Sequence, residues 1–230
     1  MDIDFVFLAL GLAAFFAGFV DSIVGGGGLI QLPALFTAFP ATSPATLFGT
    51  NKLASVIGTS SAAIQYSRRV AIPWRVAGPL ILVLLVLVAV YTFMRKDLGS
   101  ASNEPEHGRR SAALAVAIGG VIGFYDGFFG PGTGSFLIFL FIRLLGMDFL
   151  RASVSAKILN VATNLAAIAF FVGNVELMWK LAALMAACNL CGAVLGSRMA
   201  LRHGTGFVRK MFLGVVLVLI ARLTYDTLLR

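Results

Sequence analysis

The chain has 230 residues, of which 59% are hydrophobic and only 12% are charged, and its formal net charge is +8. This composition excludes an ordinary soluble globule and predicts an integral membrane protein. The basic residues lie in short stretches between apolar segments and are not interleaved with aromatic residues. They therefore indicate membrane topology and not nucleic-acid binding.

Nine apolar segments follow one another along the chain. The second and sixth, about a dozen residues each, are too short for a full membrane span and are expected to be half-helices. No segment shows the alternation of a transmembrane barrel, so the predicted fold class is an all-α, polytopic membrane helical bundle. The start MDID lacks the basic region of a secretory signal, so the first segment is expected to stay in the mature protein. The segments are 5–24, 29–39, 47–66, 76–94, 111–130, 135–146, 150–172, 178–197 and 211–229.

An internal repeat relates the two halves of the chain at a constant offset of 105 residues. A polar stretch rich in Gly and Ser, 95–110, separates them. We therefore predict a first transmembrane repeat at 1–94, a solvated linker at 95–110 and a second repeat at 111–230, an arrangement typical of secondary transporters. The matches that carry the repeat are Gly18, Phe19 and Asp21 with Gly123, Phe124 and Asp126, Gly25 and Gly27 with Gly130 and Gly132, Lys52 with Lys157, and Trp74 with Trp179.

The repeat register breaks after Ala77 and resumes at an offset of 132, so the first half lacks about 27 residues that the second half has at 183–209. The first half therefore has four apolar segments where the second has five. Counting every segment as a crossing places Arg68 and Arg69 on the opposite membrane face from the basic stretch 198–210. This count conflicts with the positive-inside rule.

Two lysines at matching repeat positions are the first candidates for chemistry. Lys52 and Lys157 each lie in a segment long enough to span a membrane, where a charge usually faces the bundle interior. The small polar residues around them predict an anion path, although such side chains also serve as packing contacts and a lysine can extend to the lipid headgroups. These neighbours are Thr50, Asn51, Ser55 and Thr59 for Lys52, and Ser153, Ser155, Asn160 and Asn164 for Lys157.

Asp21 and Asp126 each precede a glycine-rich break that leads into one of the short segments. A half-helix that starts at such a break points its positive end inward, and with the lysines it predicts an oxyanion site near the midplane. For the aspartates the alternatives are capping of backbone amides, pairing with the lysines in the empty state, and coupling to a proton or other ion. The predicted ligand-binding positions at the breaks are Gly25, Gly26, Gly27, Gly28, Gly130, Gly132 and Thr133.

The sequence gives little support for a metal site, a phosphate-binding loop or a catalytic nucleophile. Cys188 and Cys191 lack further soft ligands, and His107 and His203 have no partners at ligand spacing. No phosphate-binding loop with its Lys-Ser or Lys-Thr pair follows the glycines, and no nucleophile has a matched base. We therefore expect no metal, no cofactor and no enzymatic activity.

The motifs GFVDSIVGGGGLIQLPAL, GTNKL, GFYDGFFGPGTGSF and SAKILN resemble the repeated motifs of the TauE/SafE sulfite exporter family, most closely its YfcA-like branch. The resemblance covers about residues 5–229. It implies a multi-pass protein of the bacterial inner membrane that moves small anions bearing a sulfite or sulfonate group, coupled to a proton or ion gradient. Family members resemble a five-plus-five arrangement, from which this chain departs by one helix. A non-transporting membrane scaffold is the alternative function, and the oligomeric state is open.

Overall fold

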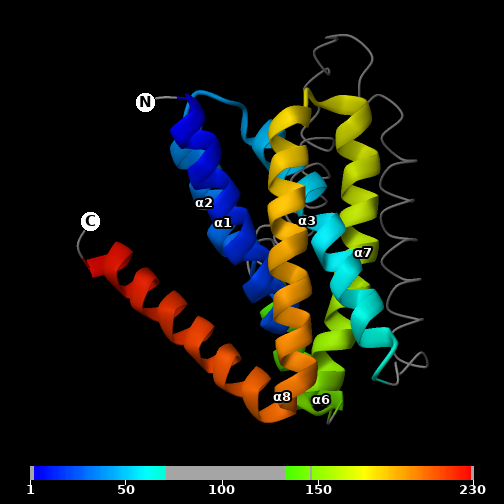
Figure 1. The fold of residues 1–230 in the computed structure, drawn as a ribbon. Coiled ribbons are helices and arrows are strands. Elements are labelled where there is room, and N and C mark those ends of the chain that lie inside the picture. Colours follow the sequence, from blue (N-terminus) through cyan, green and yellow to red (C-terminus); the bar gives the residue numbers. More distant parts are fainter. Residues whose placement is uncertain (1–2, 71–132, 146, 229–230) are drawn as a thin grey trace, which may run out of the picture.

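A computed structural model describes residues 3–70, 133–145 and 147–228, which form six α-helices (Figure 1). No strand occurs in these ranges, and the predicted all-α class is confirmed. The predictions for 76–94, for the linker 95–110 and for 111–130 lie outside the described residues. The helices are α1 (Ile3–Val24), α2 (Gly28–Ala38), α3 (Pro44–Ser67), α6 (Thr133–Leu145), α7 (Phe149–Asn174) and α8 (Trp179–Leu228).

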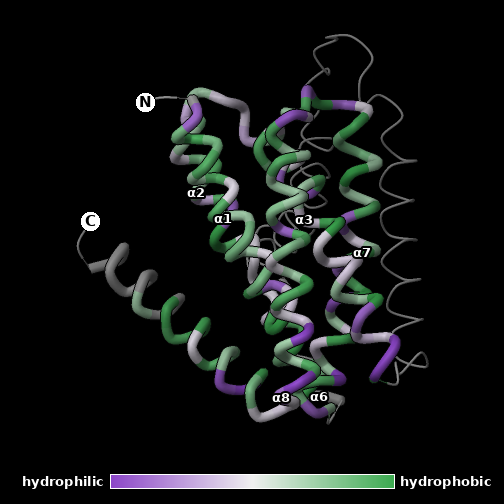
Figure 2. Tube along the Cα trace, in the orientation of Figure 1, coloured by the Kyte–Doolittle hydropathy of each residue, from purple (hydrophilic) through white to green (hydrophobic). Residues whose placement is uncertain are grey.

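Within the described ranges, three stretches are long and apolar enough to cross a membrane, namely Asp4–Val24, Phe149–Asn174 and Trp179–Val218. Figure 2 shows hydrophobic residues along most of each helix, with many of the hydrophilic ones toward the helix ends. This distribution is that of a multi-pass membrane protein. Helices α2 and α6 have 11 and 13 residues, so they fall short of a span, as predicted for half-helices.

The break between α1 and α2 depends on two of the four glycines. Gly25 and Gly26 adopt φ angles of 77° and 92°, the left-handed region that favours glycine. Gly27 then precedes α2 in a helical conformation, and Gly28 is the first residue of α2. The chain turns back here, since Leu10 and Ala14 of α1 share a buried cluster with Leu35 of α2. The predicted helix break after Asp21 is confirmed.

Polar caps extend two helices beyond their apolar segments. The Ser43 hydroxyl accepts from the Thr46 N–H at 3.2 Å, and Pro44 occupies the first turn of α3. The Asp148 carboxylate accepts from the N–H groups of Leu150 and Arg151 at 2.9 Å. Such side chains satisfy amides that a helix start leaves unpaired, so α3 begins at residue 44 and not at 47.

Helix α8 consists of two helices that meet at a kink, so the two predicted helices are present but the expected basic loop between them is not. The segments 178–197 and 211–229 belong to one helical stretch whose only non-helical residue is Gly204, with φ 69° and ψ −164°. The basic side chains at 198–210 do not prevent helix formation, because Arg and Lys are good helix formers and can reach solvent. Gly204 supplies the kink at which the last part of α8 diverges from the bundle (Figure 1).

The two basic clusters lie at the same end of the molecule, as the positive-inside rule favours and in contrast to the count of crossings. Tyr66 and Val70 at the end of α3 pack in one cluster with Ala200 and Val208, which flank the kink of α8 (Figure 1). The count treated 135–146 as a crossing, whereas the 13 residues of α6 span only about 20 Å. It also included 76–94 and 111–130, which lie outside the described residues. Arg68, Arg69, Arg198, Arg202, Arg209 and Lys210 are all exposed at this end, in agreement with the positive-inside rule.

Helices α1 and α8 pack backbone to backbone through glycines. A Cβ atom on Gly192 would collide with the Phe15 carbonyl, and one on Gly196 would lie 2.5 Å from the Phe19 carbonyl oxygen. On the opposite side, a Cβ atom on Gly18 of α1 would collide with the Asn189 carbonyl. Small residues let membrane helices approach this closely. Among the described residues, the stretch 183–209 therefore provides the main partner of α1.

Substituting alanine at Gly192 is expected to destabilise the protein by about 1–3 kcal/mol, because the added methyl group forces α1 and α8 apart. Gly173 of α7 offers a matched control, since a Cβ atom there meets nothing within 4 Å. Gly173→Ala is expected to be neutral or stabilising by up to about 1 kcal/mol through helix propensity. Thermal unfolding in detergent measures both variants, and equal effects would contradict the packing argument.

Candidate functional site

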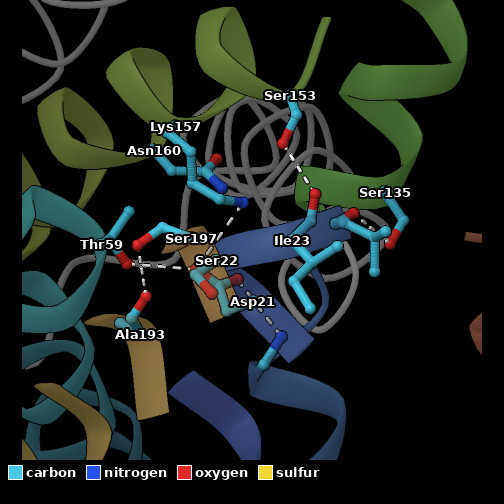
Figure 3. Close-up of polar contacts among 12 residues, drawn as sticks. Asp21, Ser22, Ile23, Thr59, Ser135, Ser153, Lys157, Asn160, Ala193 and Ser197 are labelled. Atoms are coloured by element: carbon cyan, nitrogen blue, oxygen red, sulfur yellow. Dashed lines mark hydrogen bonds and ion pairs between the residues drawn. The ribbon is translucent and has the colours of Figure 1, made fainter. Parts of the chain in front are cut away.

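The carboxyl end of α1 is held by neighbouring helices through its backbone carbonyls. The last carbonyls of a helix have no partner within the helix and need other donors when buried. Hydroxyl groups from α3, α6 and α7 supply three of them, and the chain's own turn supplies the fourth. The Gly25 N–H donates to the Asp21 carbonyl and the Tyr66 hydroxyl to the Ser22 carbonyl, each at 2.9 Å. The Ser153 hydroxyl donates to the Ile23 carbonyl at 2.8 Å and the Ser135 hydroxyl to the Val24 carbonyl at 3.0 Å (Figure 3).

Two of these donors, Tyr66 and Ser135, were not identified from the sequence. They lie 44 and 111 residues from their acceptors, so no local spacing indicates the contacts. Ser153 was expected beside an anion path, but its hydroxyl is engaged by the Ile23 carbonyl. Ser155 likewise donates to the Arg151 carbonyl at 2.9 Å within α7. Ser153 thus makes a contact between α7 and α1, whereas the Ser155 bond lies within α7.

Removing the Tyr66 hydroxyl is expected to destabilise the protein by about 1–3 kcal/mol, because Tyr66→Phe leaves the buried Ser22 carbonyl without this donor. Ser67→Ala is the control, since the Ser67 hydroxyl also donates to a carbonyl, that of Ile64, but at an exposed position. Its loss is expected to change stability by less than about 0.5 kcal/mol. Denaturant or thermal unfolding in detergent distinguishes the two variants, and a Tyr66→Phe protein as stable as the wild type would refute the role assigned to the hydroxyl.

Asp21 connects the break to two further helices. Its Oδ1 accepts from the Gly27 N–H at 3.3 Å, and its Oδ2 accepts from the Thr59 hydroxyl of α3 at 3.3 Å (Figure 3). The same Oδ2 lies 3.9 Å from Nζ of Lys157 on α7. Of the roles left open for this aspartate, the structure therefore shows both amide capping and pairing with a lysine.

Lys157 is a cation enclosed within the bundle. Its side chain is 0% exposed, whereas that of Asp21 is 18% exposed. At 3.9 Å the two charges attract each other but do not form a hydrogen bond, and Nζ has no hydrogen-bond partner among the described residues. An ammonium group offers three donors, and leaving them unused in a buried position is costly. The site is therefore suited to an anionic ligand that supplies the missing acceptors.

The glycine turn after α1 packs against the start of α6 beside this lysine. A Cβ atom on Gly25 would lie 2.6 Å from the Ser135 nitrogen, and one on Gly134 would lie 2.7 Å from the Gly25 Cα atom. The same Cβ position on Gly134 is 3.1 Å from Nδ2 of Asn160, whose side chain lies next to Lys157 (Figure 3). The backbone at the end of α1 and at the start of α6 thus packs directly together at the site.

Several predicted positions are engaged elsewhere or not described. The N–H groups of Gly25 and Gly27 already donate to Asp21, so two of the four expected amides have partners within the chain. Thr133 is the first residue of α6. Asp126, Gly130 and Gly132 lie outside the described residues, and their roles stay predictions.

The structure does not bring Lys52 to the Asp21–Lys157 pair. Lys52 is partly buried and lies two turns along α3 from Thr59, about 10 Å, without an ion pair to any described residue. Among its neighbours, Thr50 accepts from the Met178 N–H at 3.3 Å and Ser55 donates to the Asn51 carbonyl at 2.7 Å. A single midplane site that uses both lysines stays a prediction. Asn51 and Asn164, two further predicted positions, are both buried.

The chain matches one known protein family along most of its length. Residues 10–85 and 79–223 match the family described as Sulfite exporter TauE/SafE. The chain belongs to the TauE/SafE family. The two matched ranges overlap at residues 79–85. This overlap lies close to Ala77, after which the predicted repeat register breaks.

Curated relatives in the TauE/SafE family bear transporter names. The chain is 33% identical to the probable membrane transporter protein ORF9 of a Sinorhizobium species, over 98% of this chain and 95% of the relative. It is 34% identical to the probable membrane transporter protein YfcA of Escherichia coli K12, over 93% and 88%. A probable membrane transporter protein of Haemophilus influenzae is 33% identical over 98% of each chain. No solved structure matches the chain.

These alignments also show that TauE/SafE relatives are longer within the matched region. The alignment to ORF9 runs over 253 positions, whereas 98% of this 230-residue chain is about 225 residues. About 28 positions of the relative therefore have no counterpart here. This agrees with the expected absence of about 27 residues.

Proposed function

We propose that this TauE/SafE member is a secondary transporter of small anions, with sulfite and small sulfonates as its substrate class, and that Lys157 binds the anion. The observation that carries the proposal is the wholly buried ammonium group, which has a carboxylate at 3.9 Å and no hydrogen-bond partner among the described residues. A sulfite or sulfonate oxygen would accept a charge-assisted hydrogen bond from this group, which is shorter and stronger than the contact to Asp21.

Asp21 is suited to couple anion binding to a proton. An anion at Lys157 would lie close to the Asp21 carboxylate, and two negative charges at this separation repel each other. Protonation of Asp21 removes the repulsion and frees Lys157 for the substrate. Anion and proton would then bind together and cross the membrane in the same direction.

The contact between the turn after α1 and the start of α6 offers a hinge for alternating access. Gly25 and Gly134 touch through backbone atoms alone, and Gly25 lies in a conformation that few other residues adopt. Substrate binding beside this contact would change how α1 and α6 pack against α7. In this proposal the two halves are inverted repeats, and their relative motion exposes the site alternately to each side.

The exposed arginines and Lys210 at the shared end of α3 and α8 favour the cytoplasmic side for that end. This orientation belongs to a bacterial inner-membrane location, which the transporter names of the relatives also favour.

Ligand-induced stabilisation of the purified protein in detergent tests the substrate class. Sulfite and ethanesulfonate are expected to raise the unfolding temperature in a saturable way, while equal concentrations of chloride leave it unchanged. A non-transporting scaffold, in which the polar side chains serve only helix assembly, predicts the same small response to all three anions. That result would refute the proposal.

A further inference from the structure

A hollow of about 590 Å³ lies on the surface of α3. Most of its lining comes from one face of this helix, between Val56 and Arg68, and the rest from Leu165 of α7 and Leu190 of α8. Thr59, the α3 residue that contacts the anion site, is not part of the lining. The hollow is therefore separate from the anion site.

The walls and the length of this hollow suit one acyl chain of a phospholipid. Ile57 and Ile64 in its lining are 48% and 52% exposed, and lipid tails are as apolar as such side chains. Val56 and Arg68 lie twelve residues apart, about 18 Å along the helix. Half of the hydrocarbon core of a bilayer measures about 15 Å, the depth that the acyl chains of one leaflet span. The hollow thus runs from the membrane interface to about the midplane.

Arg68 gives the hollow a basic end. This residue caps the carboxyl end of α3 and is exposed. It forms no ion pair within the part of the chain that the structure describes. A guanidinium group matches the oxygens of a phosphate with parallel N–H donors, and the other basic residues at this end attract anionic lipid. Charge complementarity therefore favours an anionic headgroup over a zwitterionic one.

We propose that this hollow binds an anionic phospholipid, with the phosphate at Arg68 and one acyl chain along α3. The site goes beyond the proposed transport function and does not depend on it. Gln65, one turn deeper in the membrane, donates from Nε2 to Ser61 at 3.3 Å, and its second N–H can reach an ester carbonyl of the lipid. Leu165 and Leu190 contact the chain from two other helices. The bound lipid thus connects α3 with α7 and α8.

Native mass spectrometry of the purified protein tests the headgroup, with dioleoylphosphatidylglycerol and dioleoylphosphatidylcholine as probes. The first phosphatidylglycerol is expected to bind about tenfold tighter than the first phosphatidylcholine, because only the former combines a phosphate with a net negative charge. Arg68→Gln is expected to bring this ratio close to one. Arg69→Gln is the matched control, since Arg69 is also exposed at this depth but does not line the hollow. Equal binding of both lipids by the wild type, or equal losses in both variants, would overturn the proposal.

Two further measurements distinguish a lipid site from a phosphate site. Glycerol 3-phosphate, which has the phosphate without acyl chains, is expected to leave the lipid bound at equal concentration. Displacement would overturn the role of the chain. Ile57→Trp fills the inner part of the hollow and is expected to weaken phosphatidylglycerol about fivefold. Leu8→Trp, at a 64% exposed position of α1, is the control and should bind like the wild type. Equal affinities of the two tryptophan variants would contradict the placement of the chain.

Discussion

Lys157→Gln is expected to abolish substrate-induced stabilisation and to reduce anion transport at least 100-fold. The substitution removes the wholly buried charge on which anion binding depends, whereas the replacement amide offers only a neutral donor. The folded state should tolerate the change, since Asp21 keeps its bonds to the Gly27 N–H and the Thr59 hydroxyl. Binding titrations and flux measurements on the same preparation separate a functional loss from misfolding.

Lys180→Gln is the control for net charge, because Lys180 is exposed near the start of α8. It should bind and transport like the wild type. Lys52→Gln tests the repeat-matched lysine, which lies two turns of α3 from Thr59. This substitution is expected to slow transport while leaving binding at Lys157 detectable. Retention of full anion affinity by Lys157→Gln would refute the assignment of this residue.

Asp21→Asn is expected to destabilise the folded protein by about 3–5 kcal/mol, because it leaves the buried Lys157 without its only charged neighbour among the described residues. The asparagine can still accept from the Gly27 N–H, so loss of the cap contributes little to the effect. Thermal unfolding in detergent at neutral pH measures the change.

The double variant Asp21→Asn/Lys157→Gln isolates the charge interaction. Removing both charges is expected to restore most of the stability that Asp21→Asn loses, since no unpaired buried charge remains. Additive effects of the two substitutions would show that the residues do not interact energetically. A transport rate of Asp21→Asn that no longer responds to a proton gradient would further support the coupling role.

Several features of the fold could be predicted because local physics determines them. The lengths of the apolar segments identified α2 and α6 as half-helices, and the glycines after Asp21 indicated the break, where only Gly25 and Gly26 have positive φ angles. The division of α8 into two helices was predicted, but the helical form of the basic stretch between them was missed, because basic residues resemble a loop in sequence yet remain helical when the side chains reach solvent.

The site was predictable only in part. The position of Lys157 in an apolar segment indicated a functional charge, and pairing with an aspartate was among the alternatives. The partner could not be predicted, because Asp21 lies in the other half of the chain and the pairing depends on how α1 and α7 pack. The same limit applies to Tyr66 and Ser135, whose carbonyl partners become neighbours only in the folded bundle.

The packing of α8 also gives the stretch 183–209 a structural role. Asn189, Gly192 and Gly196 all belong to this stretch, and they hold α1 in the position that brings Asp21 to Lys157. The stretch thus supports the site from outside, although none of its residues bonds to the Asp21 side chain within the described part of the chain.

Flux of labelled sulfite or ethanesulfonate into proteoliposomes tests the central claim most directly. The account predicts saturable uptake by the wild type that increases with an inward proton gradient, and uptake at the level of empty liposomes for Lys157→Gln. Equal uptake by wild type, Lys157→Gln and empty liposomes would contradict anion transport. Equal protein-dependent uptake by the wild type and Lys157→Gln would contradict the role of the buried lysine.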